Sequence, residues 1–338
     1  RQVMAGVTAV QPIFAGGQIL NGNKLAKVNA SVKSEQLRLS EDEAVLTVEQ
    51  YYWQWVSLKE KLKTLDVVGR QIDTIRRDVS TAVDAGVAMQ NDLLQVELER
   101  NRISANRLKV NNGLTVVKML LAQAIELPAD SFDIAVSVPE DLPDPNIYKV
   151  DHQAALQITP TYRMLQKSVE ASKLQRNMEL GKRLPTIGIG AGYMYYDLPD
   201  QHSISVIENR RSMGMVFASI AIPLSDWWGG THAIRQKNVQ LKIAEESKRS
   251  NSELLLVQMQ QLWNELVEAY DQAKISKESV AKATENARIS TNCYHAGTVA
   301  VSDLLNAQSL LQQSRDQYTD DLTTYFIKRT RYLQATGR

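Results

Sequence analysis

The sequence predicts a mainly helical protein made of long coiled-coil hairpins, with a few β-strands inserted between the helices. Three observations point to this class. Apolar residues recur at spacings of three, four and seven along most of the chain, which is the pattern of a coiled-coil seam. A few short stretches alternate apolar with small residues, as strands do. The whole plan also occurs twice, at a shift of 211 residues.

The repeat aligns matched segments from both halves of the chain. Residues 85–97 read AGVAMQNDLLQVE, and residues 296–308 read AGTVAVSDLLNAQ. Pro12 falls on Pro223 at the same shift, so the register holds over a long span. Solenoid units are only about 20–50 residues long. We therefore interpret the repeat as a duplicated half-protein.

Each half contains two predicted helices, separated by the Ala-Gly pair. The first helix is expected over 18–84, with a length of roughly 100 Å at about 1.5 Å per residue and a bend at Gly69. Its partner ends before Pro128, and the second half repeats the plan at 231–294 and 299–335. The seam of the first helix contains Val45, Val48, Tyr52, Trp55, Leu62, Leu65, Ile72, Ile75, Val79 and Ala82.

Three segments read as β-strands. Residues 186–196, TIGIGAGYMYY, alternate with period two. The segments 3–14 and 213–224 overlap at the shift of 211, with Thr8 under Ser219, which puts Val216, Ala218 and Ile220 on one face. The glycines lie inside the alternation and no helix follows, so a dinucleotide loop is rejected. Lengths of 11–12 residues suit tilted membrane-crossing strands. Aromatic residues typical of bilayer interfaces gather near the strand ends: Phe14, Tyr193, Tyr195, Tyr196, Trp227 and Trp228.

Composition and motifs argue against other functions. The net charge of +1 gives no reason to expect a nucleic-acid partner. The single cysteine, Cys293, permits no intrachain disulfide, and the four histidines have no metal-ligand spacing. No catalytic triad or phosphate-binding loop occurs. We therefore expect no enzyme activity, no cofactor and no metal site.

The duplicated halves, the strand–proline–long helix order and the paired Ala-Gly and Asp-Leu-Leu motifs resemble the TolC family of bacterial outer-membrane efflux and secretion channels. The resemblance covers essentially the whole chain. It implies a homotrimer with a transmembrane β-barrel in the outer-membrane lipid and an α-barrel reaching into the periplasm. Such a duct is passive. A periplasmic adaptor opens it, and an inner-membrane pump of RND or ABC type supplies the energy.

The resemblance also implies roles for particular residues. Gly86, Val87, Ala88, Gly297, Thr298 and Val299 would form the tips that dock the adaptor. Asp92 and Tyr294 would form a latch between coils, and Asp303 with Asn306 would line the periplasmic aperture. Asn306 departs from the family's doubly acidic pattern, and Val299 stands where some members have an arginine. Pro12 and Pro223 would mark the strand-to-helix turns.

The expected domains follow the repeat. They are an outer-membrane strand at 1–14, a periplasmic hairpin at 15–127, a linker at 128–150, a helix at 151–184, an outer-membrane β-hairpin at 185–225 and a second periplasmic hairpin at 226–338. The repeat places a further strand and helix, about 60 residues, before Arg1. The alternative reading is a soluble periplasmic coiled-coil scaffold with a small β domain.

Overall fold

A computed structural model describes residues 3–136, 141–197, 210–224 and 230–338. The chain divides into two compact units. One comprises Arg1–Leu37 with Pro160–Glu253, and the other comprises Arg38–Thr159 with Leu254–Arg338. The long helices α1 (Gln18–Asp84) and α6 (Thr231–His295) contribute residues to both units. Their bounds confirm the helices predicted at 18–84 and 231–294.

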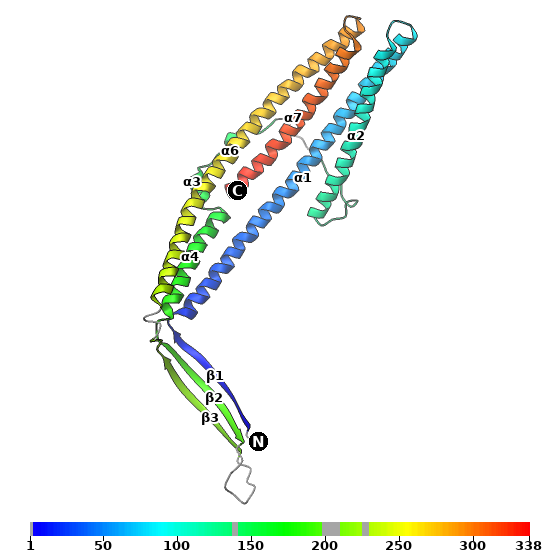
Figure 1. The fold of residues 1–338 in the computed structure, drawn as a ribbon. Coiled ribbons are helices and arrows are strands. Elements are labelled where there is room, and N and C mark those ends of the chain that lie inside the picture. Colours follow the sequence, from blue (N-terminus) through cyan, green and yellow to red (C-terminus); the bar gives the residue numbers. More distant parts are fainter. Residues whose placement is uncertain (1–2, 137–140, 198–209, 225–229) are drawn as a thin grey trace, which may run out of the picture. The chain divides into compact units, whose positions relative to one another are not determined.

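The first unit contains a three-stranded antiparallel sheet with the order β1-β2-β3 (Figure 1). Its strands are β1 (Val3–Ala15), β2 (Thr186–Asp197) and β3 (Arg210–Ala221). Ala9 pairs with Ala191, which pairs with Val216. Successive residues of a strand point to opposite faces. Ala5, Val7, Ala9, Val216, Ala218 and Ile220 therefore share one face, as the repeat predicted.

The opposite face of the sheet has a stripe of glycines along β2. A Cβ built on Gly190 would lie 2.4 Å from the ring of Phe217 on β3. Gly188 and Gly192 are crowded in the same way by side chains of β1 and β3. The alternating glycines therefore make room for their neighbours' side chains, which is their structural function in the strand.

Helix α4 (Pro160–Gly181) belongs to the same unit as the sheet. Arg163 forms an ion pair with Glu35 of α1 at 3.4 Å, and Lys248 of α6 lies over the ring of Tyr162. The last residue of α4 meets the end of β1 backbone to backbone. A Cβ on Gly181 would lie 2.3 Å from the carbonyl oxygen of Gly16.

The second unit is a layer of helices in the order α6, α7 (Val301–Ala335), α1 and α2 (Gln90–Ala124), visible in Figure 1. Ion pairs connect each neighbour to the next: Lys328 with Glu265, Lys61 with Asp320, and Arg107 with Asp66. The apolar seam is buried as predicted at Leu65, Ile72, Ile75 and Val79. Val45 is the exception, because it is 56% exposed.

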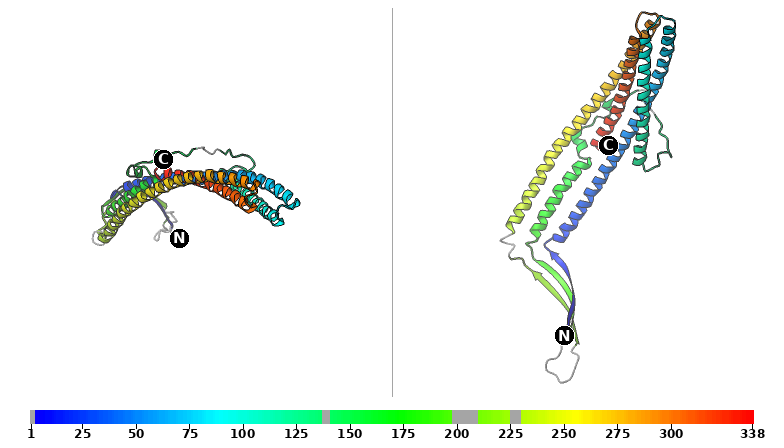
Figure 2. Two further views of the ribbon diagram at one scale, coloured as in Figure 1. Left: turned by 90° about the horizontal axis from the view of Figure 1, so that it is seen from above. Right: turned by 45° about the vertical axis from the view of Figure 1, so that its right-hand side comes forward.

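The segment between the halves runs over one face of this helical layer (Figure 2). It contains η1 (Pro145–Tyr148) and leads into the short helix α3 (His152–Leu156). Its phenylalanine and aliphatic residues, Phe132, Ile134 and Val136, pack against Trp55 and its neighbours. The buried Tyr325 donates a hydrogen bond to the Pro143 carbonyl at 2.6 Å. The linker is therefore fixed to the helices by both apolar and polar contacts.

Within the described ranges, none of the helices combines the length and the apolar character needed to cross a lipid bilayer.

Candidate functional site at the helical tips

The two Ala-Gly pairs form the same turn. Gly86 has φ of 75° and Gly297 has φ of 71°, a left-handed conformation that L side chains rarely adopt. Gly86 N–H donates to the Val83 carbonyl and Val87 N–H to the Ala82 carbonyl, both at 2.9 Å. Gly297 and Thr298 donate to Tyr294 and Cys293 in the same way. Both are Schellman motifs, which satisfy the last carbonyls of the helix.

The residues that follow each glycine point mostly into solvent. Val87 is 80% exposed, and Thr298 is also exposed, although its hydroxyl donates to the Cys293 carbonyl at 3.0 Å. Ala88 and Val299 are half-buried. Each turn therefore presents one exposed side chain next to its glycine, apolar at Val87 and polar at Thr298.

The two aspartates after the turns behave differently, although the repeat aligns them. The Asp92 carboxylate accepts a hydrogen bond from the Met89 N–H at 3.1 Å, which caps the start of α2. Helix α7 begins after Ala300 without any side-chain cap. Asp303 is exposed, and within the described residues it makes no comparable capping contact, so its carboxylate is available for another role.

Asp303 and Asn306 lie on the solvent side of α7. Leu304 is completely buried, and Leu305 packs against the same apolar cluster. Asn306 is exposed, like Asp303, and residues three apart share one side of a helix. Packing of the two leucines therefore fixes the direction of both polar side chains.

Tyr294 lies at the end of α6, against the apolar cluster near the tips. Burial raises the pKa of Tyr294, and the negative charges of Asp78 and Asp92 raise it further. The ring also lies against His295, with centroids 5.8 Å apart. Tyr294 therefore lies close to both aspartates. In the described part of the chain, the only hydrogen bond of the Asp92 carboxylate is to its own helix start.

The proline and aromatic predictions have mixed outcomes. Pro12 was predicted at a strand-to-helix turn but lies inside β1, at a bulge, and the strand continues to Ala15. A bulge tolerates proline because one residue there is left out of the hydrogen-bond ladder. Pro223 does follow the end of β3. Trp227 and Trp228 lie outside the described residues.

The four remaining aromatic residues do not share one face of the sheet. Phe14, Tyr193 and Tyr195 lie on the face that carries Val7 and Val216. Tyr196 lies on the other face, where its hydroxyl contacts the Met194 sulfur at 3.3 Å. Three of these four aromatic residues therefore share a face of the sheet, and Tyr196 does not belong to that group.

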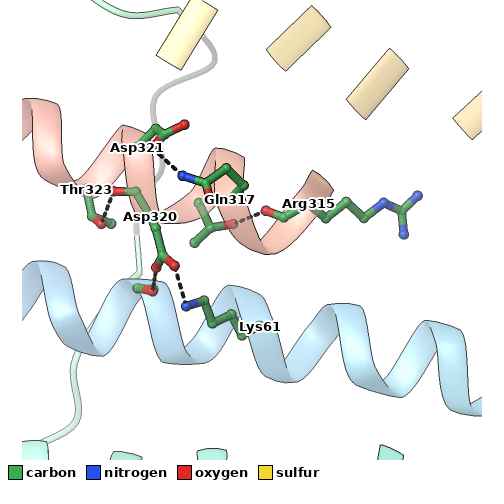
Figure 3. Close-up of polar contacts among 8 residues, drawn as sticks. Lys61, Arg315, Gln317, Asp320, Asp321 and Thr323 are labelled. Atoms are coloured by element: carbon green, nitrogen blue, oxygen red, sulfur yellow. Dashed lines mark hydrogen bonds and ion pairs between the residues drawn. The ribbon is translucent and has the colours of Figure 1, made fainter. Parts of the chain in front are cut away.

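Sequence reasoning missed a polar contact between the hairpins. Asp320 of α7 accepts hydrogen bonds from Ser57 at 3.0 Å and from Lys61 at 2.7 Å (Figure 3). Gln317 donates to Asp321 on another side of the same helix. In the sequence, the only sign of this face is that polar residues recur at every fourth position, from Gln308 through Asp316 to Asp320.

The fold is that of outer-membrane channels. The channel OprN matches with TM-score 0.80 and 14% identity over 100% of this chain and 81% of that chain. VceC from Vibrio cholerae matches with TM-score 0.78 and 11% identity over 100% and 87%. The open state of the Neisseria gonorrhoeae MtrE outer membrane channel matches with TM-score 0.76 and 12% identity over 100% and 80%. No curated protein sequence matches the chain significantly.

The family model of the outer membrane efflux protein matches residues 152–338. The chain belongs to this family, as the repeat and its motifs indicated. It is an exit duct of an efflux system and is located in the outer membrane. The family consists of transport conduits and not of enzymes.

Proposed function

We propose that the chain is one subunit of a homotrimer in which the strands form a transmembrane β-barrel and the helical hairpins form a periplasmic α-barrel. A periplasmic adaptor opens this passive duct, and an inner-membrane pump of RND or ABC type drives export. The observation that supports the trimer is an exposed apolar stripe on each edge helix of the layer.

On α2, the stripe lies on the side opposite the buried seam of Val96, Ile103 and Leu114. Its members are between 46% and 72% exposed: Leu94, Leu98, Leu108, Val116 and Met119. On α6, Leu254, Val257, Ile275 and Ile289 lie opposite the buried Leu266 and Ala273. Helices at the two edges that each present a second apolar face are suited to pair with a second copy.

The two stripes match in register. Leu94 and Leu108 are 14 residues apart, and so are Ile275 and Ile289. Leu94 lies four residues after the start of α2, and Ile289 lies six residues before the end of α6. An antiparallel α2–α6 contact between copies therefore places Leu94 beside Ile289 and Leu108 beside Ile275. Such a heterologous contact gives a closed ring when the rotation between successive copies closes, as the proposed trimer requires.

The sheet supports the membrane assignment. Its apolar face is open to the surroundings, with Val216 82%, Val7 77% and Ile220 69% exposed. In lipid, unpaired strand edges are not tolerated, so β1 and β3 need partner strands from other copies. Lipid covers the apolar face in this arrangement, and Phe14, Tyr193 and Tyr195 lie at its two ends.

Cysteine pairs test the ring. In a Cys293→Ser background, Leu94→Cys with Ile289→Cys, and Leu108→Cys with Ile275→Cys, should oxidise to covalent dimers and trimers. The recombined pairs, Leu94→Cys with Ile275→Cys and Leu108→Cys with Ile289→Cys, are the matched control. In each recombined pair the two cysteines would lie about 21 Å apart along the helices. These variants should therefore form no covalent dimers or trimers. Equal cross-linking of all four combinations, or of none, contradicts the proposed ring.

The adaptor is proposed to dock on the two turns, through Gly86, Val87, Ala88, Gly297, Thr298 and Val299. Substitution of either glycine would strain the Schellman motif, so the exposed neighbours give the cleaner test. Val87→Glu and Thr298→Trp should reduce export in cells by about tenfold or more, the effect of removing roughly 1.4 kcal/mol of binding, while the trimer persists. Unchanged export by both variants counts against docking at the tips.

We further assign Asp92 and Tyr294 to a latch that forms when Asp92 leaves its capping contact, and Asp303 with Asn306 to the aperture. The outer-membrane part then comprises 1–14 and 185–225. The periplasmic hairpins are 15–127 and 226–338, joined by the linker at 128–150 and the helix at 151–184.

A further inference from the structure

The interface between α1 and α7 is polar in its middle part. Two apolar clusters hold these helices together, one with Val301 and Leu304 and the other with Leu322 and Phe326. Between the clusters, polar side chains recur every four residues along α7: Gln308, Gln312, Asp316 and Asp320. Gln308 and Gln312 are only 5% and 6% exposed. Polar side chains therefore line this stretch of α7, and at Asp320 they bond directly to α1.

One ammonium group faces two carboxylates in this stretch. Asp320 uses both of its oxygens, with Ser57 at 3.0 Å and Lys61 at 2.7 Å (Figure 3). Asp316 lies one turn away on the same helix, and its Oδ1 is buried without a hydrogen-bond partner. Burying an ionised carboxylate without full compensation is costly, and a proton removes that cost.

Among the residues that the structure describes, few charged groups surround Asp316. From α1 it faces Lys61, which is shared with Asp320, and on α7 its neighbours are Gln312 and Asp320. From α2, Arg102 reaches Gln312 at 3.5 Å, but it pairs mainly with Glu99. Burial raises the pKa of Asp316 and the charge of Asp320 adds to the rise, while Lys61 and Gln312 oppose it.

We propose that Asp316 is a proton-controlled joint between the two helical hairpins, which pack more tightly when this carboxyl is protonated. It is a regulatory device that rests on the proposed function, since α7 leads to the aperture at Asp303. By linkage, whatever separates α7 from α1 also releases the proton. Acid then favours the packed interface, and neutral pH favours its opening.

The direction of the pH effect follows from the raised pKa. The folded protein holds the proton more tightly than the unfolded chain, whose Asp pKa is about 3.9. The stabilisation is complete below that value. It decreases as pH rises towards the raised pKa of the packed state and is lost above it.

Hydrogen exchange of the trimer in detergent tests this. Amides of residues 305–320 are compared at pH 5 and pH 8 after correction for intrinsic exchange. From pH 5 to pH 8, the protection of these amides in the wild type should fall by about tenfold for each unit by which the packed interface raises the pKa of Asp316. Asp316→Asn should show the same protection at both pH values. Asp316→Ser serves as a second neutral variant where Asn impairs folding.

Two further variants sharpen the result. Asp321→Asn is the matched control, because Asp321 is on the same helix but accepts from Gln317 and should leave the pH effect intact. Lys61→Gln should move the transition to higher pH, since it removes a cation that opposes the rise of the Asp316 pKa. The proposal is wrong if Asp316→Asn and Asp316→Ser both keep the full pH effect, or if the wild type shows no pH effect. The cysteine pairs on α2 and α6 report separately on the trimer.

Discussion

At the residue scale, the repeat extends to the ends of the returning helices. Leu127 N–H donates to the Ala122 carbonyl and Arg338 N–H to the Leu333 carbonyl, so α2 and α7 both end in Schellman motifs. The left-handed position holds Gly337 in α7 but Glu126 in α2. Glu126 has φ of 56°, and no other non-glycine residue of the described chain has positive φ. The first half therefore retains a strained residue where the second has a glycine.

Replacing this residue should stabilise the protein. The left-handed conformation costs a non-glycine residue about 1–2 kcal/mol, which a glycine would not pay. The greater flexibility of glycine in the unfolded chain cancels about half of this stabilisation. We expect Glu126→Gly to raise the melting temperature in detergent by about 2 °C. The matched variant Gly337→Ala should lower it, because its Cβ would also lie 3.1 Å from Ile158. A lower melting temperature for Glu126→Gly would show that the Glu126 side chain has an unseen stabilising role.

At the scale of elements, periodicity predicted the helices and strands well. The long helix predicted over 18–84 is observed at Gln18–Asp84, because an apolar seam repeated every three to four residues suits only a helix. The strand at 3–14 was predicted with its correct face. The proline inside it was misplaced because a bulge depends on pairing with β2, which the sequence of β1 alone does not report.

Contacts between elements were harder to predict than the elements themselves. Helix α7 buries Leu304, and it also buries Gln308 and Gln312 at neighbouring positions. Polar residues on a helix are normally assigned to its solvent face. The carboxylate of Asp320, further along this helix, is bonded to Lys61 and Ser57, which lie more than 200 residues earlier in the chain. A periodicity search has no access to such a distant partner.

At the scale of the whole molecule, the difference between Asp92 and Asp303 has consequences for the channel. Asp92 is engaged at its own helix start, whereas Asp303 is exposed and uncapped. In the proposed trimer, three copies of Asp303 surround the axis close to the tips, because each lies six residues past Gly297, within about 9 Å along the helix. Three carboxylates around a narrow opening repel one another and attract cations. Asn306 adds hydrogen-bonding groups to the same ring without charge.

This ring should determine how polyvalent cations block the open channel. In planar bilayers, Asp303→Ala should raise the conductance and weaken cation block, since it removes three negative charges from the constriction. Asn306→Asp should have the opposite effect, by adding three charges one helical turn away. Asp92→Ala is the comparison at the aligned position, and it should mainly reduce helix stability by about 1 kcal/mol through loss of the cap. Cation block that is unchanged in Asp303→Ala and Asn306→Asp would show that these side chains do not face the pore.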